Sequence, residues 1–222
     1  MTRSPVILCL LSLVACLLLS ACGSHPGSPG SLAQAKDLPA VEGNAECRLV
    51  NDSSPVIRVT RRDRTLDLAA PRELPFFAND RLENTSPEII RLACLSDEAT
   101  FAVKPRSRLD FQVKSLVLQE GQVRMEFTKV KGVFRIRLPG AVLAIRGTSL
   151  EVTVNPDKTS NVALLEGTIG IIGPDGQEKP MEAGQQAAIP ATPGGNVQIS
   201  PLGDIKGSFD DLSEDKAIKT IR

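Results

Sequence analysis

The sequence has no tryptophan, no tyrosine and a single histidine, and aromatic residues make up only 3% of its 222 residues. So few aromatic rings argue against surfaces that stack on sugars or bases and against aromatic hot-spot interfaces. The one histidine, His25, precedes the region expected to fold, which excludes a Ser-His-Asp or Cys-His catalytic group within it. A metal site of His and Cys ligands lacks candidates for the same reason. We therefore expect a non-enzymatic protein without a metal or a bound cofactor.

The chain also lacks net charge, because 26 basic residues balance 26 acidic ones. No overall electrostatic field then draws the protein to nucleic acid or to anionic lipid. Nucleic acid is therefore not an expected partner. Acidic pairs such as Asp210-Asp211 lie in a polar stretch, where a solvated role is expected in place of acid-base catalysis.

An apolar run near the N-terminus has the features of an export signal. Residues 5–19 are apolar apart from Ser12, and the basic residue Arg3 precedes them. The run is shorter than the roughly 20 residues that span a bilayer, and no basic cluster follows it. We predict a signal peptide over residues 1–21, removed from the mature protein.

The residues at the predicted cleavage point, Leu19-Ser20-Ala21-Cys22, resemble the bacterial lipobox. The resemblance implies a thioether-linked diacylglycerol and a further acyl chain on Cys22, which together anchor a protein stably in a membrane. The alternative is an ordinary secretory signal with an accidental cysteine. Gly23 stands where inner-membrane lipoproteins carry aspartate, which resembles the pattern for export to the outer membrane. The expected location is the periplasmic face of that membrane.

The rest of the chain divides by composition into three parts. Residues 22–45 are rich in small and turn-forming residues, lack apolar periodicity and are expected to be a flexible tether. Residues 46–200 are enough for one domain with a single core. Residues 201–222 are expected to be a polar tail, in which Ser213-Glu214-Asp215 could begin a short helix.

The cysteines leave one pair in the region expected to fold. Cys9 and Cys16 belong to the signal peptide and Cys22 to the lipid anchor, so Cys47 and Cys94 remain. In an oxidising compartment these two are expected to form a disulfide. A metal site and two separate buried thiols stay open as alternatives.

Apolar and polar side chains alternate with a period of two in several segments of the middle region. The segments are residues 56–60, 108–113, 134–138 and 149–154. This period gives a strand one dry and one wet face, as in antiparallel sheets. Turn-forming residues separate the segments. The predicted fold class is all-β, an antiparallel sandwich or roll or a short β-solenoid, with a short C-terminal helix or tail.

Two eight-residue segments share the form Leu-x-Glu-Gly-x-β-x-apolar. They are residues 118–125 and 164–171. Each is expected to contain a strand, a glycine bend and a second strand, stacked as successive rungs or related by a pseudo-twofold axis. Chance similarity in a β-rich chain is the alternative.

Three short motifs follow one another in residues 142–186. They are Ala144-Ile145-Arg146-Gly147-Thr148, Leu164-Leu165-Glu166-Gly167-Thr168-Ile169 and Ala183-Gly184-Gln185. This order resembles the FecR domain family, and residues 78–82 and 99–111 resemble the upstream part of its pattern. The likeness would cover residues 54–190.

The residues of the family motif have expected structural roles. Gly147 allows a bend closed to residues with a Cβ, and the Arg146 guanidinium can bind backbone carbonyls or a carboxylate. The Thr148 hydroxyl can close the same turn. Glu166, Gly167 and Gly184 complete the motif. A ligand-binding role for Arg146 is the alternative.

The family resembles the periplasmic part of iron-citrate sensors, which pass a signal from an outer-membrane transporter to a sigma factor. Only residues 1–4 precede the apolar run, so no cytoplasmic anti-sigma region is expected. Three hypotheses follow. The first is a lipid-anchored, non-catalytic binding or scaffold module for an envelope protein or glycan. The second is a detached sensor or regulator of envelope or iron-uptake signalling, and the third is a periplasmic lipid carrier.

Overall fold

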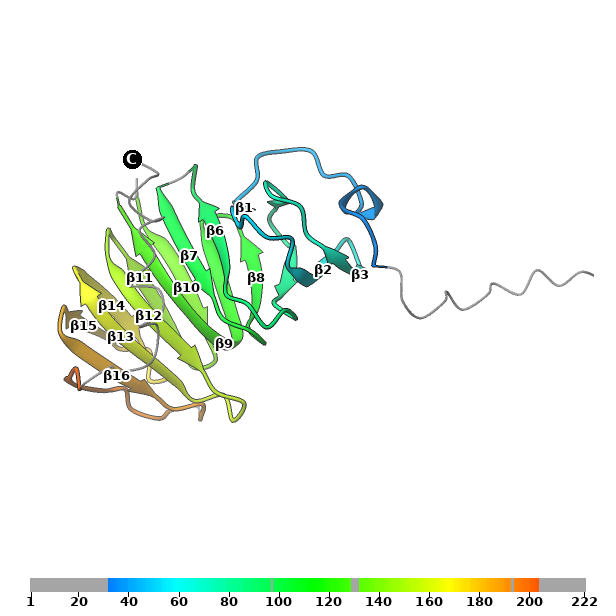
Figure 1. Ribbon diagram of the computed structural model, residues 1–222. Coiled ribbons are helices and arrows are strands. Elements are labelled where there is room, and N and C mark those ends of the chain that lie inside the picture. The colour runs from blue at the N-terminus through cyan, green and yellow to red at the C-terminus, as the bar shows by residue number, and fades with distance from the viewer. Residues whose placement is uncertain (1–31, 97, 129–131, 193, 204–222) are drawn as a thin grey trace, which may run out of the picture. The chain divides into compact units, whose positions relative to one another are not determined.

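The alternating segments form strands throughout the described part of the chain. The computed structural model describes residues 32–96, 98–128, 132–192 and 194–203. These residues contain seventeen strands and one short 3-10 helix, η1 (Ala35–Asp37), which confirms the predicted all-β class (Figure 1). No helix within these ranges is long and apolar enough to cross a membrane. The signal peptide and Cys22 lie outside the described residues, as does the tail beyond residue 203.

The strands join in one hydrogen-bonded network, which folds into two layers. Sheet A contains, in spatial order, β3 (Arg64–Ala69), β2 (Val56–Arg61), β5 (Arg81–Glu83), β8 (Arg108–Gln112), the first half of β9 (Ser115–Phe127), β10 (Phe134–Leu138), β11 (Ala141–Ile145), β14 (Thr168–Ile172) and β15 (Glu178–Glu182). Sheet B contains β4 (Pro75–Phe76), β1 (Cys47–Leu49), β6 (Ile90–Cys94), β7 (Ala99–Val103), the second half of β9, β12 (Ser149–Val154), β13 (Ser160–Glu166), β16 (Gln185–Ile189) and β17 (Gln198–Pro201). All neighbours are antiparallel except β9 and β10, which are parallel.

Strand β9 belongs to both layers because it bends in the middle. Its first half pairs with β8 in sheet A, and its second half pairs with β7 in sheet B. The bend lies at Gly121, whose φ is +99°, and a Cβ there would lie 2.4 Å from the Cα of Ser107. Only glycine fits this combination of positive φ and close backbone approach.

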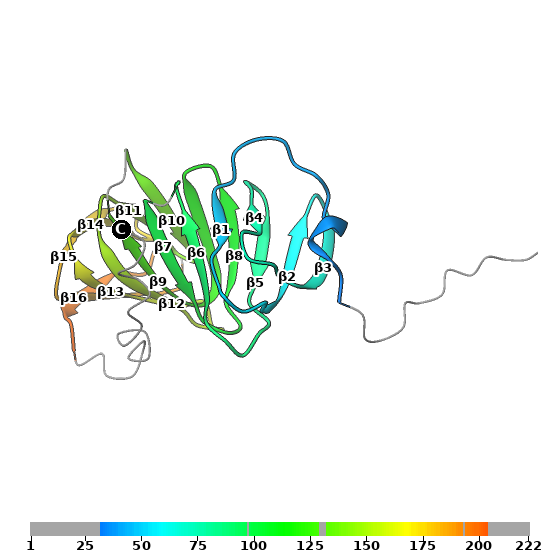
Figure 2. The ribbon, with the colours of Figure 1, turned by 45° about the horizontal axis from the view of Figure 1, so that its top comes forward.

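Side chains from both layers meet in one apolar core. Phe76 of β4 stacks on Phe111 of β8 with the ring centroids 5.1 Å apart, and Phe101 of β7 lies 6.2 Å from Phe134 of β10. Each pair joins sheet B to sheet A. Figure 2 shows the same two layers farther along the chain, with β11 and β14 in one and β13 and β16 in the other. The architecture is therefore a two-layer sandwich, the arrangement in which facing sheets bury their inner side chains.

Part of the segment expected to be a tether packs on the β unit. Ala33 forms a parallel bridge with Leu68 on the edge strand β3, and the Leu38 side chain is 7% exposed. Covering an edge strand in this way satisfies backbone groups that would otherwise be open to another chain. The sequence pattern did not indicate this contact, because a single leucine and one bridge leave no periodicity.

The predicted disulfide is present. Cys47 of β1 and Cys94 of β6 are register partners in sheet B, and their sulfur atoms are bonded. The two other readings, a metal site and separate thiols, therefore do not apply.

Candidate binding surface

The residues of the family motif gather where the chain passes between the two sheets. Residues 146–148 connect β11 to β12, Gly167 lies between β13 and β14, and Gly184 lies between β15 and β16. These three crossings are adjacent, because Ala183 N donates to Gly167 O at 3.1 Å and a Cβ on Gly167 would touch residues 147 and 148. The structure thus brings the motif residues together in one row along an edge of the sandwich.

Gly167 is the most restricted position in this row. Its φ is +85°, and a Cβ would lie 2.7 Å from the carbonyl oxygen of Gly147 and 2.8 Å from Cγ2 of Thr148. Gly147 and Gly184 also have positive φ, +67° and +79°, but a Cβ on either would meet nothing within 4 Å. The motif therefore needs glycine at 167 for space and conformation, and at 147 and 184 for conformation alone.

Two expected contacts of the motif are not formed among the described residues. The Arg146 side chain is exposed and makes no hydrogen bond or ion pair there, so it does not clamp the turn. The Thr148 residue is 3% exposed, and its hydroxyl has no hydrogen-bond partner. Its methyl group instead faces Gly167. Thr148 thus acts through packing, and Arg146 remains available to a ligand.

Replacing Gly167 with alanine should lower the free energy of unfolding by about 2–4 kcal/mol, because a left-handed φ and a backbone clash add together. Gly147→Ala and Gly184→Ala should each cost only about 1–2 kcal/mol, the conformational part alone. Urea denaturation of the three variants measures the difference. Equal losses in all three would show that the contact with Thr148 does not restrict position 167.

Each of the two similar segments, residues 118–125 and 164–171, contains a glycine bend, but the two bends are not stacked on each other. Gly121 faces Ser107 much as Gly167 faces Thr148. In sheet B, however, Gly121 is in register with Val154 at one end of β12, whereas Glu166 is in register with Ser149 at the other end. The two glycine bends therefore lie on opposite edges of the sandwich, which agrees with the pseudo-twofold interpretation.

The upstream part of the motif contains a buried ion pair. Asp80 accepts hydrogen bonds from Arg61 at 2.6 Å (Nη2 to Oδ2) and 2.9 Å (Nε to Oδ1). The two side chains are 2% and 7% exposed. Arg61 also donates to Pro75 O at 2.8 Å, and its guanidinium lies 4.8 Å from the Phe77 ring centroid. The Arg61–Asp80 pair connects the end of β2 to the crossing between β4 and β5. Its role is to hold these elements together.

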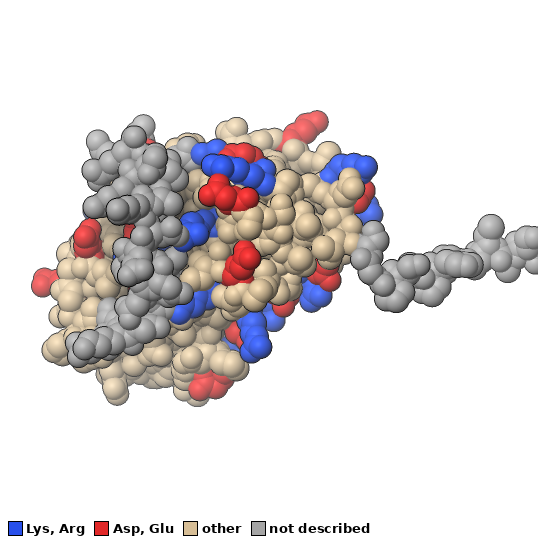
Figure 3. Space-filling view, viewed as in Figure 1, with Lys and Arg blue, Asp and Glu red and all other residues tan. Residues whose placement is uncertain are grey.

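The outer face of sheet A carries cross-strand ion pairs over its first strands. Arg58 of β2 donates to Asp67 of β3 at 2.7 and 3.0 Å, and Arg81 of β5 donates to Asp110 of β8 at 2.6 and 3.0 Å. The hydrogen bonds from Arg58 lower the pKa of Asp67. On the face drawn in Figure 3, basic and acidic side chains likewise lie side by side in several places. Paired charges of this kind neutralise each other.

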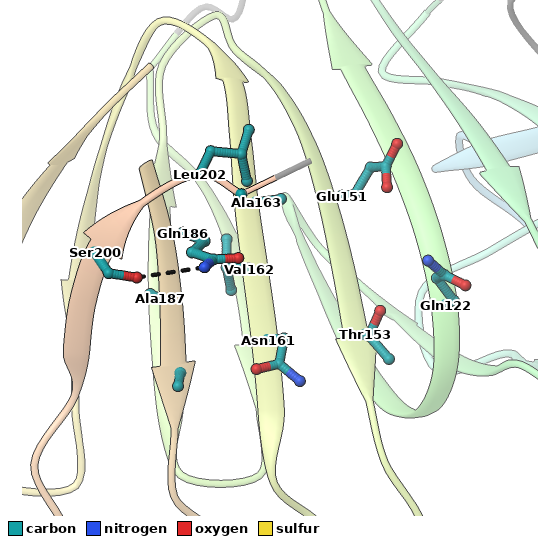
Figure 4. Close-up of a pocket in the computed structure, with 12 residues that line it drawn as sticks. Gln122, Glu151, Thr153, Asn161, Val162, Ala163, Gln186, Ala187, Ser200 and Leu202 are labelled. Atoms are coloured by element: carbon teal, nitrogen blue, oxygen red, sulfur yellow. Dashed lines mark hydrogen bonds between the residues drawn. The ribbon is translucent and has the colours of Figure 1, made fainter. Parts of the chain in front are cut away.

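The outer face of sheet B has a shallow hollow of about 280 Å³ across β12, β13 and β16 (Figure 4). The residues that line it are Gln122, Glu151, Thr153, Asn161, Val162, Ala163, Gln186, Ala187, Ala188, Ser200, Leu202 and Gly203. Glu151 is the one ionisable side chain in this set. The amide of Gln186 lies 3.4 Å from the Ser200 hydroxyl, and Asn161 and Thr153 project beside it.

The chemistry of this hollow is that of a recognition surface. Amide and hydroxyl groups can donate and accept hydrogen bonds, while Ala163 and Ala188 leave space for the groups of a ligand. The sequence analysis missed these residues, although small and amide side chains do occupy the outward positions of β13 and β16. Without the strand pairing, nothing indicated that they meet on one face.

Part of the chain is similar to known proteins. Residues 82–170 match the model of the FecR protein family, which confirms the resemblance over that range. Two crystal structures of a candidate anti-sigma factor from Parabacteroides distasonis ATCC 8503, at 1.65 and 2.50 Å, are 16% identical with a TM-score of 0.47. Each match covers 55% of this chain and 59% of that chain, so this chain spans less than two thirds of its length. No curated protein matches the chain.

Proposed function

We propose that this chain, which carries a FecR domain over residues 82–170, is a non-catalytic, lipid-anchored binding component of a cell-envelope signalling system. The family match supports the regulatory part of the proposal. The resemblance of residues 19–22 to a lipobox supports the anchor at Cys22, and Gly23 in place of aspartate supports a position on the periplasmic face of the outer membrane. The observation that carries the binding role is the hollow on sheet B.

The hollow suits a peptide segment of an envelope protein. Hydrogen-bonding side chains such as Asn161 and Gln186 face outward on neighbouring strands, which gives partners to a peptide backbone. Small residues between them let that backbone approach closely. A glycan fits less well, because the lining contains no aromatic ring on which a sugar could stack.

The family motif supports this surface without being part of it. Residues 146–148, Gly167 and Gly184 hold the crossings between the sheets, whereas the hollow lies on the outer face of the strands that these crossings connect. The space between the sheets is filled by buried apolar side chains of both layers, so it offers no shelter for acyl chains. The lipid-carrier hypothesis therefore receives no support from the core.

Site-specific photocrosslinking in living cells tests the proposal. A photoreactive residue at Gln186 should capture one dominant envelope protein, and the same residue at Thr65, on the outer face of sheet A, should not. Ala163→Arg, which places a long charged side chain in the hollow, should abolish the capture at 186. Identical crosslinks from both positions, or crosslinks that survive Ala163→Arg, would refute the hollow as the binding surface.

The regulatory part has a separate readout. Deletion of the gene should change the transcription of a defined set of genes, and the wild-type chain but not the Ala163→Arg variant should restore it. If the partner is captured but transcription stays unchanged on deletion, the protein is a scaffold without a signalling role.

A further inference from the structure

Strand β10 presents two arginines that have no partner among the described residues. Phe134, Ile136 and Leu138 of this strand are buried, so Arg135 and Arg137 point outward from sheet A, and both are exposed. In register with Arg135 lie Ser115 and Ala144. The register partners of Arg137 are Val117 and Val142. No carboxylate therefore stands opposite either guanidinium.

This arrangement differs from that of two arginines on the first strands of the same face. Arg58 and Arg81 each have an aspartate directly opposite, at hydrogen-bond distance. Arg146, which follows β11, is exposed and, like the two arginines of β10, has no partner among the described residues. Ion pairs thus lie over β2, β3, β5 and β8, whereas the arginines of β10 and the end of β11 have no ion pair among the described residues.

An exposed apolar side chain lies beside this cationic region. Val113, 70% exposed, and Lys114 form the tip of the hairpin between β8 and β9. The tip is next to β10, because Arg135 N donates to Lys114 O at 3.3 Å. We call Val113, Lys114, Arg135, Arg137 and Arg146 the arginine surface. A carboxylate also contacts this surface, because Oε2 of Glu46 accepts a hydrogen bond from Lys114 N at 3.4 Å.

We propose that the arginine surface docks on the anionic phospholipid headgroups of the membrane that holds the lipid anchor. The inference rests on the proposed anchor at Cys22. Leu32, the first described residue, lies ten residues after Cys22, so the chain between them reaches at most about 35 Å. A unit held so near a membrane meets its headgroups continuously, and unpaired arginines with an adjacent apolar tip are the side chains that bind there.

The zero net charge of the chain does not oppose this docking. Attraction to a charged surface depends on the charges within about one Debye length of it, and the register partners of Arg135 and Arg137 carry no charge. Arginine also suits phosphate groups through its forked donors. The expectation from composition, that no field draws the protein to anionic lipid, thus holds for the whole chain but not for this surface.

The test uses the full-length lipidated protein reconstituted into vesicles, with an environment-sensitive fluorophore at Val113→Cys and the native disulfide left oxidised. In vesicles of phosphatidylethanolamine with phosphatidylglycerol, the label should be shielded from an aqueous quencher. In phosphatidylcholine vesicles it should be exposed. Changing Arg135, Arg137 and Arg146 to glutamine should shift the docking equilibrium about a hundredfold toward the undocked state.

A matched control removes the same charge elsewhere. Arg72, Arg106 and Lys158, all exposed and outside the arginine surface, are changed to glutamine and should leave the shielding unaltered. Equal shielding in both vesicle types, or loss of shielding only with the control, would overturn the inference. The mass of the reconstituted protein reports separately whether Cys22 carries lipid, so failure of the anchor is distinguished from failure of docking.

Discussion

Replacing Asp80 with asparagine should lower the free energy of unfolding by about 3–5 kcal/mol. The substitution keeps the size of the side chain but leaves the Arg61 guanidinium buried without a counter-charge, and the two side chains are 2% and 7% exposed. The remaining contacts of Arg61, with Pro75 O and the Phe77 ring, do not balance its charge. Chemical denaturation followed by circular dichroism measures the loss.

The control for this prediction is Asp67→Asn, which removes an exposed ion pair on the same sheet. Its partner Arg58 is 44% exposed, so water takes over the lost contact and the cost should stay below about 1 kcal/mol. The double change Arg61→Met with Asp80→Leu should recover much of the stability lost in Asp80→Asn, because it removes both charges. If Asp80→Asn costs no more than Asp67→Asn, burial of the Arg61–Asp80 pair contributes little to the free energy of unfolding.

Loss of the disulfide should have an effect of similar size. Changing Cys47 and Cys94 together to serine opens a loop whose ends are 47 residues apart, which restores denatured-state entropy equal to about 4 kcal/mol. The unfolding midpoint in urea should fall accordingly, and a reducing agent should lower the midpoint of the wild-type protein by the same amount. A reducing agent that changes the double variant as much as the wild type would contradict this explanation.

The strands could be predicted from the sequence because alternation is a local property. Residues 134–138 fold as predicted, with Phe134, Ile136 and Leu138 buried and the two arginines outward. The disulfide also followed from counting, since Cys47 and Cys94 were the remaining pair. The division of the strands between two sheets could not be predicted, because it depends on pairings between distant segments.

The sites illustrate the same difference between local and distant information. The glycine bend at Gly167 was expected, but its cause, contact with residues 147 and 148, appears only in the folded chain. The partner of Asp80 lies 19 residues earlier, at Arg61, and no periodicity connects them. The hollow on sheet B combines outward residues of strands that are far apart in sequence, so no single segment indicated it.

These results assign different tasks to different parts of the sandwich. The motif residues along one edge fix the crossings between sheets, and the outer face of sheet B offers amide and hydroxyl groups, together with Glu151, in a hollow. The outer face of sheet A carries, on β10, two arginines without a partner among the described residues. In the proposed arrangement, which depends on the anchor, one face binds a partner while the other meets lipid.

The most direct test of this account is the intact mass and N-terminal peptide mass of the protein extracted from native membranes. The account predicts a mature chain that begins at Cys22 and carries a diacylglycerol and a further acyl chain. A chain that retains residues 1–21, or one that begins with an unmodified residue and is released without detergent, would contradict it.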